Sequence, residues 1–217
     1  MATDSILSEP VQGLSSADEL ANSLTHGAGL LLSLAGAGVM VSAMQASNTW
    51  VQLSAMVYVA SLVAVYALST LSHAVQAMPH KNRLRAWDQG TIYLLIAGSY
   101  TPFIAAFVPP GQAAVLTAAM WLAAGFGFWL KVVANHRVIA FSAWSYIALG
   151  WFPAVAFVGR IPLACVMWMV LGGVSYTVGT VFLKLDTRVR YFHAIWHILV
   201  IIASACHFHA ILTYAVA

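Results

Sequence analysis

The sequence predicts an all-α integral membrane protein, a bundle of seven transmembrane helices, and three observations lead to this class. Of its 217 residues, 62% are hydrophobic and only 7% are charged, whereas about a quarter of the residues in an average soluble domain are charged. Its apolar runs continue for the roughly 20 residues that cross a hydrocarbon core of about 30 Å. These runs also lack the alternating polarity of membrane-barrel strands. A soluble enzyme, a disordered chain and a disulfide-stapled secreted domain are therefore excluded.

Seven apolar stretches define the expected helices, and turn residues separate several of them. Proline and glycine mark turns at residues 109–111 and 159–162. Because the connections are short, consecutive helices should be neighbours in one compact bundle. Pro153 lies inside the fifth stretch and is expected to kink it. The stretches cover residues 20–44, 50–76, 88–108, 113–134, 138–158, 162–183 and 192–216.

The start of the chain is expected to lie outside the membrane. Residues 1–17 form a predicted cytoplasmic tail, and residues 18–217 a single membrane domain. The tail contains acidic but no basic residues, so it lacks the positive region that opens a signal peptide. Ser16, followed three residues later by Glu19, predicts a capping box at the start of the first helix.

The basic residues predict the orientation of the bundle. Cytoplasmic loops of membrane proteins are enriched in Lys and Arg, and here eight basic residues fall on one side and one on the other. The N-terminus should therefore be cytoplasmic and the C-terminus outside, with the chain in the cell inner (plasma) membrane. The eight are Lys81, Arg83, Arg85, Lys131, Arg137, Lys184, Arg188 and Arg190, and the single residue opposite them is Arg160.

Two further features of the composition carry little functional information. Cys165 and Cys206 are too few for a disulfide framework or a thiolate zinc site, so we interpret them as small apolar residues. The formal net charge of +3 does not indicate a nucleic-acid partner in a membrane protein. The expected partner of the chain is the lipid bilayer.

Polar residues inside the apolar stretches are the candidates for function, because each is costly in hydrocarbon. They recur at helical spacing, so each set shares one helix face. By the predicted orientation, all of them lie near the cytoplasmic ends of their helices, in a single layer. They are Glu19, Asn22 and His26 in the first stretch, Ser69 and His73 in the second, Asp88 at the start of the third, and His193 and His197 in the seventh.

A zinc site is the chemistry that this layer favours. On a helix, His193 and His197 point their imidazoles in the same direction and can offer two nitrogens to one metal ion. His73, at the same depth, would be a third ligand, and three protein ligands with an open position are typical of catalytic zinc. Asp88 would orient or deprotonate the metal-bound water, and Ser69 would hydrogen-bond the carboxylate, the water or a substrate carbonyl.

Simpler interpretations remain open at this stage. The histidine pair could prefer the membrane surface, Ser69 could serve helix packing, and Glu19, Asn22 and His26 could cap the first helix and brace the loops. His207 is about 20 Å further along the helix axis than His193, so it cannot share the same metal. We expect structural roles for His207 and His209, and we assign none to the loop residues His80 and His136.

Four blocks of the sequence together carry a family resemblance: Glu19–Gly27, Ser69–His73, Asp88–Phe103 and His193–His197. They resemble the hemolysin III family, which is related to the progestin and adipoQ receptors and more distantly to the alkaline ceramidases. The resemblance extends over residues 18–210. It implies a seven-helix fold with a cytoplasmic N-terminus, and a zinc ion held by histidines that match His73, His193 and His197, with an aspartate matching Asp88 and a serine matching Ser69.

The expected function is zinc-dependent hydrolysis of a lipid-like amide or ester that enters from the cytoplasmic leaflet. Two other classes stay open: a pore-forming or cytolytic protein, as the family name implies, and a receptor-like regulator with a structural zinc ion. The missing charged residues in the outer halves of the helices argue against a selective ion path. The sequence specifies neither the substrate or ligand nor the oligomeric state.

Overall fold

The computed structural model describes residues 15–134 and 139–216, and all regular structure in these residues is helical. A 3-10 turn, Met44–Ala46, follows the first helix, a 3-10 segment, Phe152–Phe157, follows the fifth, and a π-helical segment, Ile211–Val216, follows the seventh. The α-helices are α1 (Ser16–Ala43), α2 (Thr49–Ala74), α3 (His80–Phe107), α4 (Pro110–Val132), α5 (Ile139–Trp151), α6 (Leu163–Leu185) and α7 (Phe192–Ala210).

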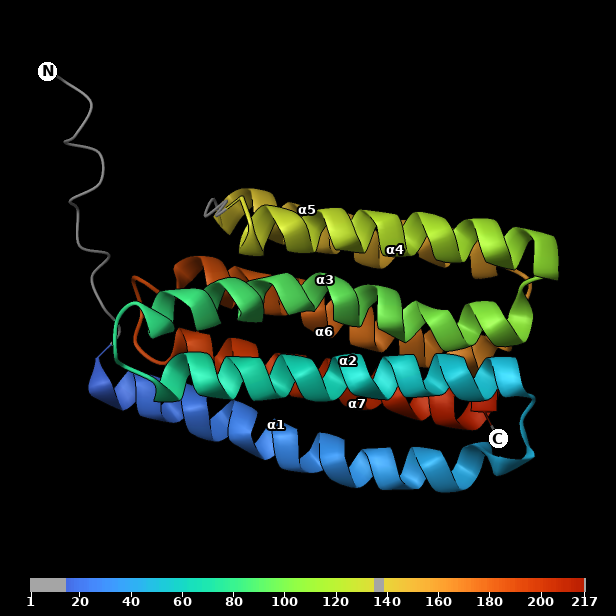
Figure 1. Cartoon of the computed structure of the whole chain (residues 1–217), viewed down its shortest axis with the longest axis horizontal. Coiled ribbons are helices and arrows are strands. Elements are labelled where there is room, and N and C mark those ends of the chain that lie inside the picture. Colours follow the sequence, from blue (N-terminus) through green and yellow to red (C-terminus); the bar gives the residue numbers. More distant parts are fainter. Residues whose placement is uncertain (1–14, 135–138, 217) are drawn as a thin grey trace, which may run out of the picture.

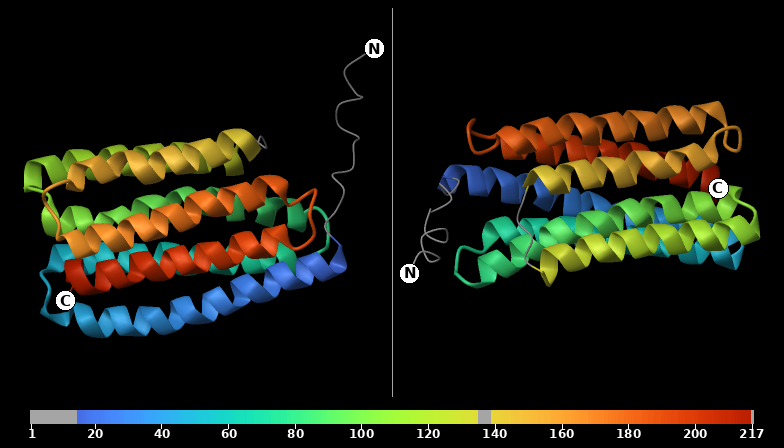
Figure 2. Two further views of the ribbon diagram at one scale, coloured as in Figure 1. Left: turned by 180° about the vertical axis from the view of Figure 1, so that it is seen from behind. Right: turned by 90° about the horizontal axis from the view of Figure 1, so that it is seen from above.

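The helices lie nearly parallel to one another and form successive layers (Figure 1). Helix α1 covers the pair α2 and α7, which in turn packs on α3 and α6, and α4 and α5 form the opposite side (Figure 2). The first turn of α1, the end of α2, the start of α3 and the start of α7 meet at one end of the bundle, which we name the site end. This is the end at which the sequence places the polar layer.

Six of the described helical segments are long and apolar enough to cross a membrane. They correspond to α1 with its 3-10 turn, α2, α3, α4, α6, and α7 with its π-helical segment. The remaining apolar segment is the shorter run Ala143–Phe157. The chain is thus a multi-pass membrane protein, and its outward faces agree with this, since many large apolar side chains on them are exposed.

Two helix starts differ from the sequence prediction. Helix α1 is capped by Ser15 rather than Ser16, because the Ser15 hydroxyl accepts a hydrogen bond from the Asp18 amide at 3.2 Å. The Glu19 side chain does not close a capping box and turns to another helix instead. Helix α3 begins at His80, not at Asp88, so the first turns of α3 contain residues that we expected in a loop.

The fifth helix changes form near its proline. Its α-helix ends at Trp151, two residues before Pro153, and the chain continues as a 3-10 segment, because proline cannot supply the amide that the α-helix requires. Pro102 lies inside α3 without ending it. At the end opposite the site end, the Ser47 hydroxyl donates to the Val216 carbonyl at 2.5 Å and ties the turn after α1 to the last described residues.

Candidate metal centre

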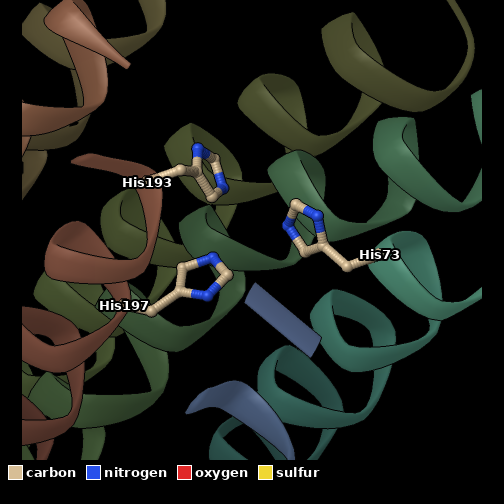
Figure 3. A group of neighbouring side chains, drawn as sticks. All are labelled: His73, His193 and His197. Atoms are coloured by element: carbon tan, nitrogen blue, oxygen red, sulfur yellow. The ribbon is translucent and has the colours of Figure 1, made fainter. Parts of the chain in front are cut away.

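Three histidines converge at the site end (Figure 3). His73 comes from the last turn of α2, and His193 and His197 come from the first two turns of α7. One ligand atom from each ring lies within 4.8 Å of the other two. Three nitrogens on one tetrahedral zinc ion lie about 3.3 Å apart, so modest side-chain rotation closes the set around an ion.

A hydrogen bond at Nδ1 fixes the orientation of each of the three rings. Nδ1 of His73 lies 2.6 Å from a Glu19 carboxylate oxygen, and Nδ1 of His193 lies 2.7 Å from an Asp186 carboxylate oxygen. Nδ1 of His197 lies 3.1 Å from the backbone carbonyl of Asn22. Carboxylate and carbonyl oxygens can only accept, so the proton of each neutral imidazole is on Nδ1. Nε2, with its free lone pair, is then the atom available to a metal.

The Nε2 atom of His73 supports the fit to a metal ion. It is buried and has no hydrogen-bond partner, although buried polar atoms nearly always have one. A metal ion beside this nitrogen would satisfy it, and imidazole nitrogen is a preferred zinc ligand. The three histidines therefore match a zinc ion in donor type, in number and in tautomer.

Cations from α3 hold the carboxylate behind His73. The other oxygen of Glu19 accepts from Lys81 Nζ at 2.7 Å and from Arg85 Nη2 at 3.0 Å. The Glu19 side chain is only 6% exposed, and a buried carboxylate requires such compensation. Helices α1, α2 and α3 are thus joined through one carboxylate that orients a candidate ligand.

The first turn of α7 is fixed by a different acidic residue. Tyr191, with φ of +64°, is the left-handed residue that precedes α7. Its amide donates to a carboxylate oxygen of Asp18 at 3.0 Å, which holds the chain where it turns into the helix carrying His193. All four acidic residues in the described part of the chain lie at the site end: Asp18, Glu19, Asp88 and Asp186.

Asp88 lies two turns inside α3, which corrects the prediction that it opens the helix. The Ser72 hydroxyl donates to its Oδ2 at 3.0 Å, and the Ser69 side chain also hydrogen-bonds to it. The carboxylate is near enough to His73 and His193 to interact with both electrostatically. Asp88 and Ser69 thus lie beside the three histidines, as the polar layer predicted.

The remaining predicted residues, on α1, form the inner wall of the centre. The His26 ring stacks on the His197 ring with a centroid separation of 3.4 Å and meets Tyr66 edge-on. Neither ring nitrogen of His26 and neither side-chain polar atom of Asn22 has a partner, although both residues are buried. The backbone carbonyl of Asn22 nevertheless orients His197. The side chains of Asn22 and His26 thus neither cap the first helix nor brace the loops.

A cavity of about 290 Å³ extends from the candidate metal centre into the bundle. That volume is near the lower end of the range for ligand cavities. His73, Asp88, His193 and His197 line it at the site end. Beyond them its walls are mostly apolar and come from α3, α5, α6 and α7, including Ile92, Leu95, Ile96, Ile147 and Leu183.

Several residues of the centre were missed by sequence reasoning. Asp186 was not singled out, although it is an acidic residue seven positions before His193. Ser72 was passed over in favour of Ser69, and Lys81 and Arg85 were used only for orientation. The signal that could have found these residues is that each lies close in sequence to a residue of the polar layer. His136, to which no role was assigned, lies outside the described residues, and His80 is the first residue of α3 rather than a loop residue.

Fold and site together define a multi-pass helical membrane protein with a buried histidine cluster that can hold a metal ion. Comparison with known proteins gives the family. The family model described as "Haemolysin-III related" matches residues 14–208, and the chain belongs to this family, which confirms the resemblance found in the sequence.

Curated relatives match over nearly the whole chain. The Hemolysin-3 homolog of Bacillus subtilis (strain 168) is 32% identical over 203 residues, which is 92% of this chain and 95% of the relative. Hemolysin-3 of Bacillus cereus is 32% identical over 201 residues, 91% of each chain. The human Monocyte to macrophage differentiation factor is 26% identical over 204 residues, 91% of this chain and 84% of the relative, which supports the wider superfamily.

Proposed function

We propose that this protein is a zinc-dependent membrane hydrolase that cleaves a lipid-like amide or ester. One observation carries the proposal. Three histidines present metal-ready nitrogens beside a partly buried carboxylate, that of Asp88, at the mouth of an apolar cavity. A metal site that only braced helices would need neither the carboxylate nor the cavity. Metal-assisted hydrolysis uses both.

Each residue of the site has a separate role in the proposed reaction. His73, His193 and His197 would hold zinc, which when bound would polarise the substrate carbonyl and lower the pKa of a water molecule. Asp88 accepts the proton of the attacking water and then delivers it to the leaving group. Ser72 holds the Asp88 carboxylate at 3.0 Å, and Ser69 hydrogen-bonds either that carboxylate or the substrate carbonyl.

The cavity supports a substrate with one apolar chain. Its walls beyond the histidines are mostly apolar side chains, so a hydrocarbon chain that leaves the bilayer for the cavity keeps apolar surroundings. The scissile amide or ester then lies at the histidines, at the boundary between the hydrocarbon and the polar end of the bundle. The hydrocarbon chain of the substrate enters the cavity from the cytoplasmic leaflet.

The proposal includes seven membrane spans, with the N-terminus cytoplasmic and residues 18–217 forming one membrane domain in the inner (plasma) membrane. The 13 residues of α5 and the 6 of its 3-10 continuation give about 30 Å at their usual rises per residue. That length matches the hydrocarbon core. The eight-to-one distribution of basic residues supports the orientation.

Turnover by the detergent-purified chain tests the hydrolase. The protein is mixed with N-acyl amides and acyl esters of a fluorescent amine or alcohol, with zinc, with a chelator, and with zinc restored after chelation. The proposal expects release of the fluorophore that the chelator abolishes and zinc restores. Hydrolysis that is insensitive to the chelator, or no hydrolysis of any substrate by zinc-loaded protein, contradicts it.

Formation of pores is a second candidate function, favoured by the names of two bacterial relatives, Hemolysin-3 and its homolog. Leakage of dye from liposomes that contain the purified chain tests it, with and without chelator. The outer halves of the described helices contain no Asp, Glu, Lys or Arg, which argues against a selective ion path through one copy and leaves a pore between copies of the chain. Leakage without hydrolysis would favour this function over the enzyme.

A further inference from the structure

The cavity has a second polar group at the end far from the candidate metal centre, which we name the distal end. His207, on α7, lines the same cavity as His193 and His197. Fourteen residues separate His193 from His207, which is close to four helical turns and about 21 Å along the axis. His193, Val200 and His207 therefore lie along one face of α7, and all three line the cavity.

His207 lacks the hydrogen bond that its surroundings would require. Its Nδ1 is buried and has no partner, which is costly in an apolar interior. The ring packs where α6 has Gly172, because a Cβ at that position would overlap the imidazole. The nearby Tyr176 hydroxyl pairs with the Ser204 hydroxyl at 2.9 Å and makes no hydrogen bond to Nδ1 of His207.

The other polar side chains of this part of the cavity are already paired. Trp151 donates to the Thr177 hydroxyl at 3.0 Å, and that hydroxyl donates to a backbone carbonyl. Ser99 and Tyr100 each donate to a backbone carbonyl. Among the cavity-lining residues of the distal half that the structure describes, His207 is the one with a buried side-chain polar atom that has no hydrogen-bond partner.

We propose that His207 is a binding site for a polar group on the far end of the ligand chain. The preferred ligand is a single-chain lipid with a head group at the three histidines and a hydroxyl about 20 Å away. A hydroxyl suits the site because it both donates and accepts, and so pairs with an imidazole nitrogen in either tautomer. The inference rests on the proposed function only in placing the head group at the histidines.

Competition binding tests this site without requiring turnover. Radiolabelled palmitate is bound to the full-length, zinc-loaded chain in detergent and displaced by unlabelled palmitate or by ω-hydroxypalmitate. The wild-type chain should prefer the hydroxylated acid by about threefold to tenfold, the effect of one net hydrogen bond. His207→Phe, which removes both ring nitrogens, should lose the preference.

Two further variants control for the fold and for the chemistry. His209 lies two residues away and does not line the cavity, and its ring centroid is 4.6 Å from that of Trp168. The preference for the hydroxylated acid should therefore survive in His209→Phe. His207→Asn keeps a polar atom near the position of Nδ1 and should retain part of the preference, which loss of packing alone would not allow.

Each outcome separates the two proposals. Equal binding of both acids by the wild type, an undiminished preference in His207→Phe, or no binding of either acid overturns the role of His207. A preference that depends on His207 without hydrolysis of any amide or ester sustains the binding site and refutes the enzyme. Hydrolysis with no preference for a hydroxylated chain sustains the enzyme and refutes the binding site at His207.

Discussion

Replacing Glu19 by glutamine should weaken metal binding and destabilise the fold at the same time. Glu19 is the carboxylate that both orients His73 and compensates Lys81 and Arg85. Glutamine keeps the shape and can still accept from Nδ1, but it removes the negative charge. The substitution therefore separates the electrostatic part of the interaction from its geometry.

The expected magnitudes follow from these contacts. Loss of a carboxylate behind a metal-binding imidazole lowers metal affinity by about 10-fold to 100-fold, which is about 1.4–2.7 kcal/mol. Lys81, whose side chain is 14% exposed, then has no carboxylate partner, and breaking a buried ion pair costs about 3–5 kcal/mol. Because Lys81 and Arg85 are partly exposed, we expect the lower end of that range.

A matched variant sharpens the experiment. Asp186→Asn removes the carboxylate that orients His193 at 2.7 Å, and its only described ion pair is with that histidine. Zinc affinity should fall by the same 10-fold to 100-fold, with a smaller loss of stability than in Glu19→Gln. Zinc titration against a competing chelator and thermal unfolding of the zinc-free protein measure the two effects. Unchanged zinc affinity in Glu19→Gln, alongside lower stability, would refute the reasoning and leave Glu19 as a structural ion pair.

Three other predictions concern the ligands, the base and the topology. Alanine in place of His73, His193 or His197 should abolish zinc retention on gel filtration. Each variant should also lose the zinc-dependent stabilisation in a melting experiment, which is about 4 kcal/mol when free zinc is at a thousand times its Kd. If one of these variants retains zinc, the residue it replaces is not a ligand. Asp88→Asn should keep zinc with affinity lowered at most about 100-fold and lose about 10²–10⁴ in turnover, so undiminished turnover would show that another group is the base. A reporter fused to the C-terminus should be active only outside the cytoplasm, and cytoplasmic activity would mean an even number of spans or an inverted bundle.

The sequence was sufficient to place the polar residues in one layer. Hydropathy locates each span along the membrane normal, and helical spacing assigns residues to faces. For this reason His73 and His193, far apart in sequence, could be predicted at the same depth. Hydropathy does not determine how each helix is rotated or which helices are adjacent, so the pairing of Glu19 with His73 could be seen only in the structure.

The residues that the sequence analysis missed lie at helix ends, where hydropathy is least informative. The first two turns of α3, which carry Lys81 and Arg85, are polar and were interpreted as a loop. They are helical because α3 extends beyond the apolar stretch at the site end. Asp186 follows the last residue of α6, and its contact with His193 depends on the path of the chain between α6 and α7. No periodic pattern in the sequence encodes that path.

X-ray absorption spectroscopy at the zinc edge can show whether three imidazoles on α2 and α7 hold one zinc ion, on which the proposed function depends. The sample is the full-length chain purified in detergent, with its zinc content measured by elemental analysis. We expect one zinc ion per chain, bound by three imidazole nitrogens at about 2.0–2.1 Å and by one oxygen ligand. Protein that retains no zinc after its addition, or a spectrum with sulfur ligands or fewer than three imidazoles, would contradict it.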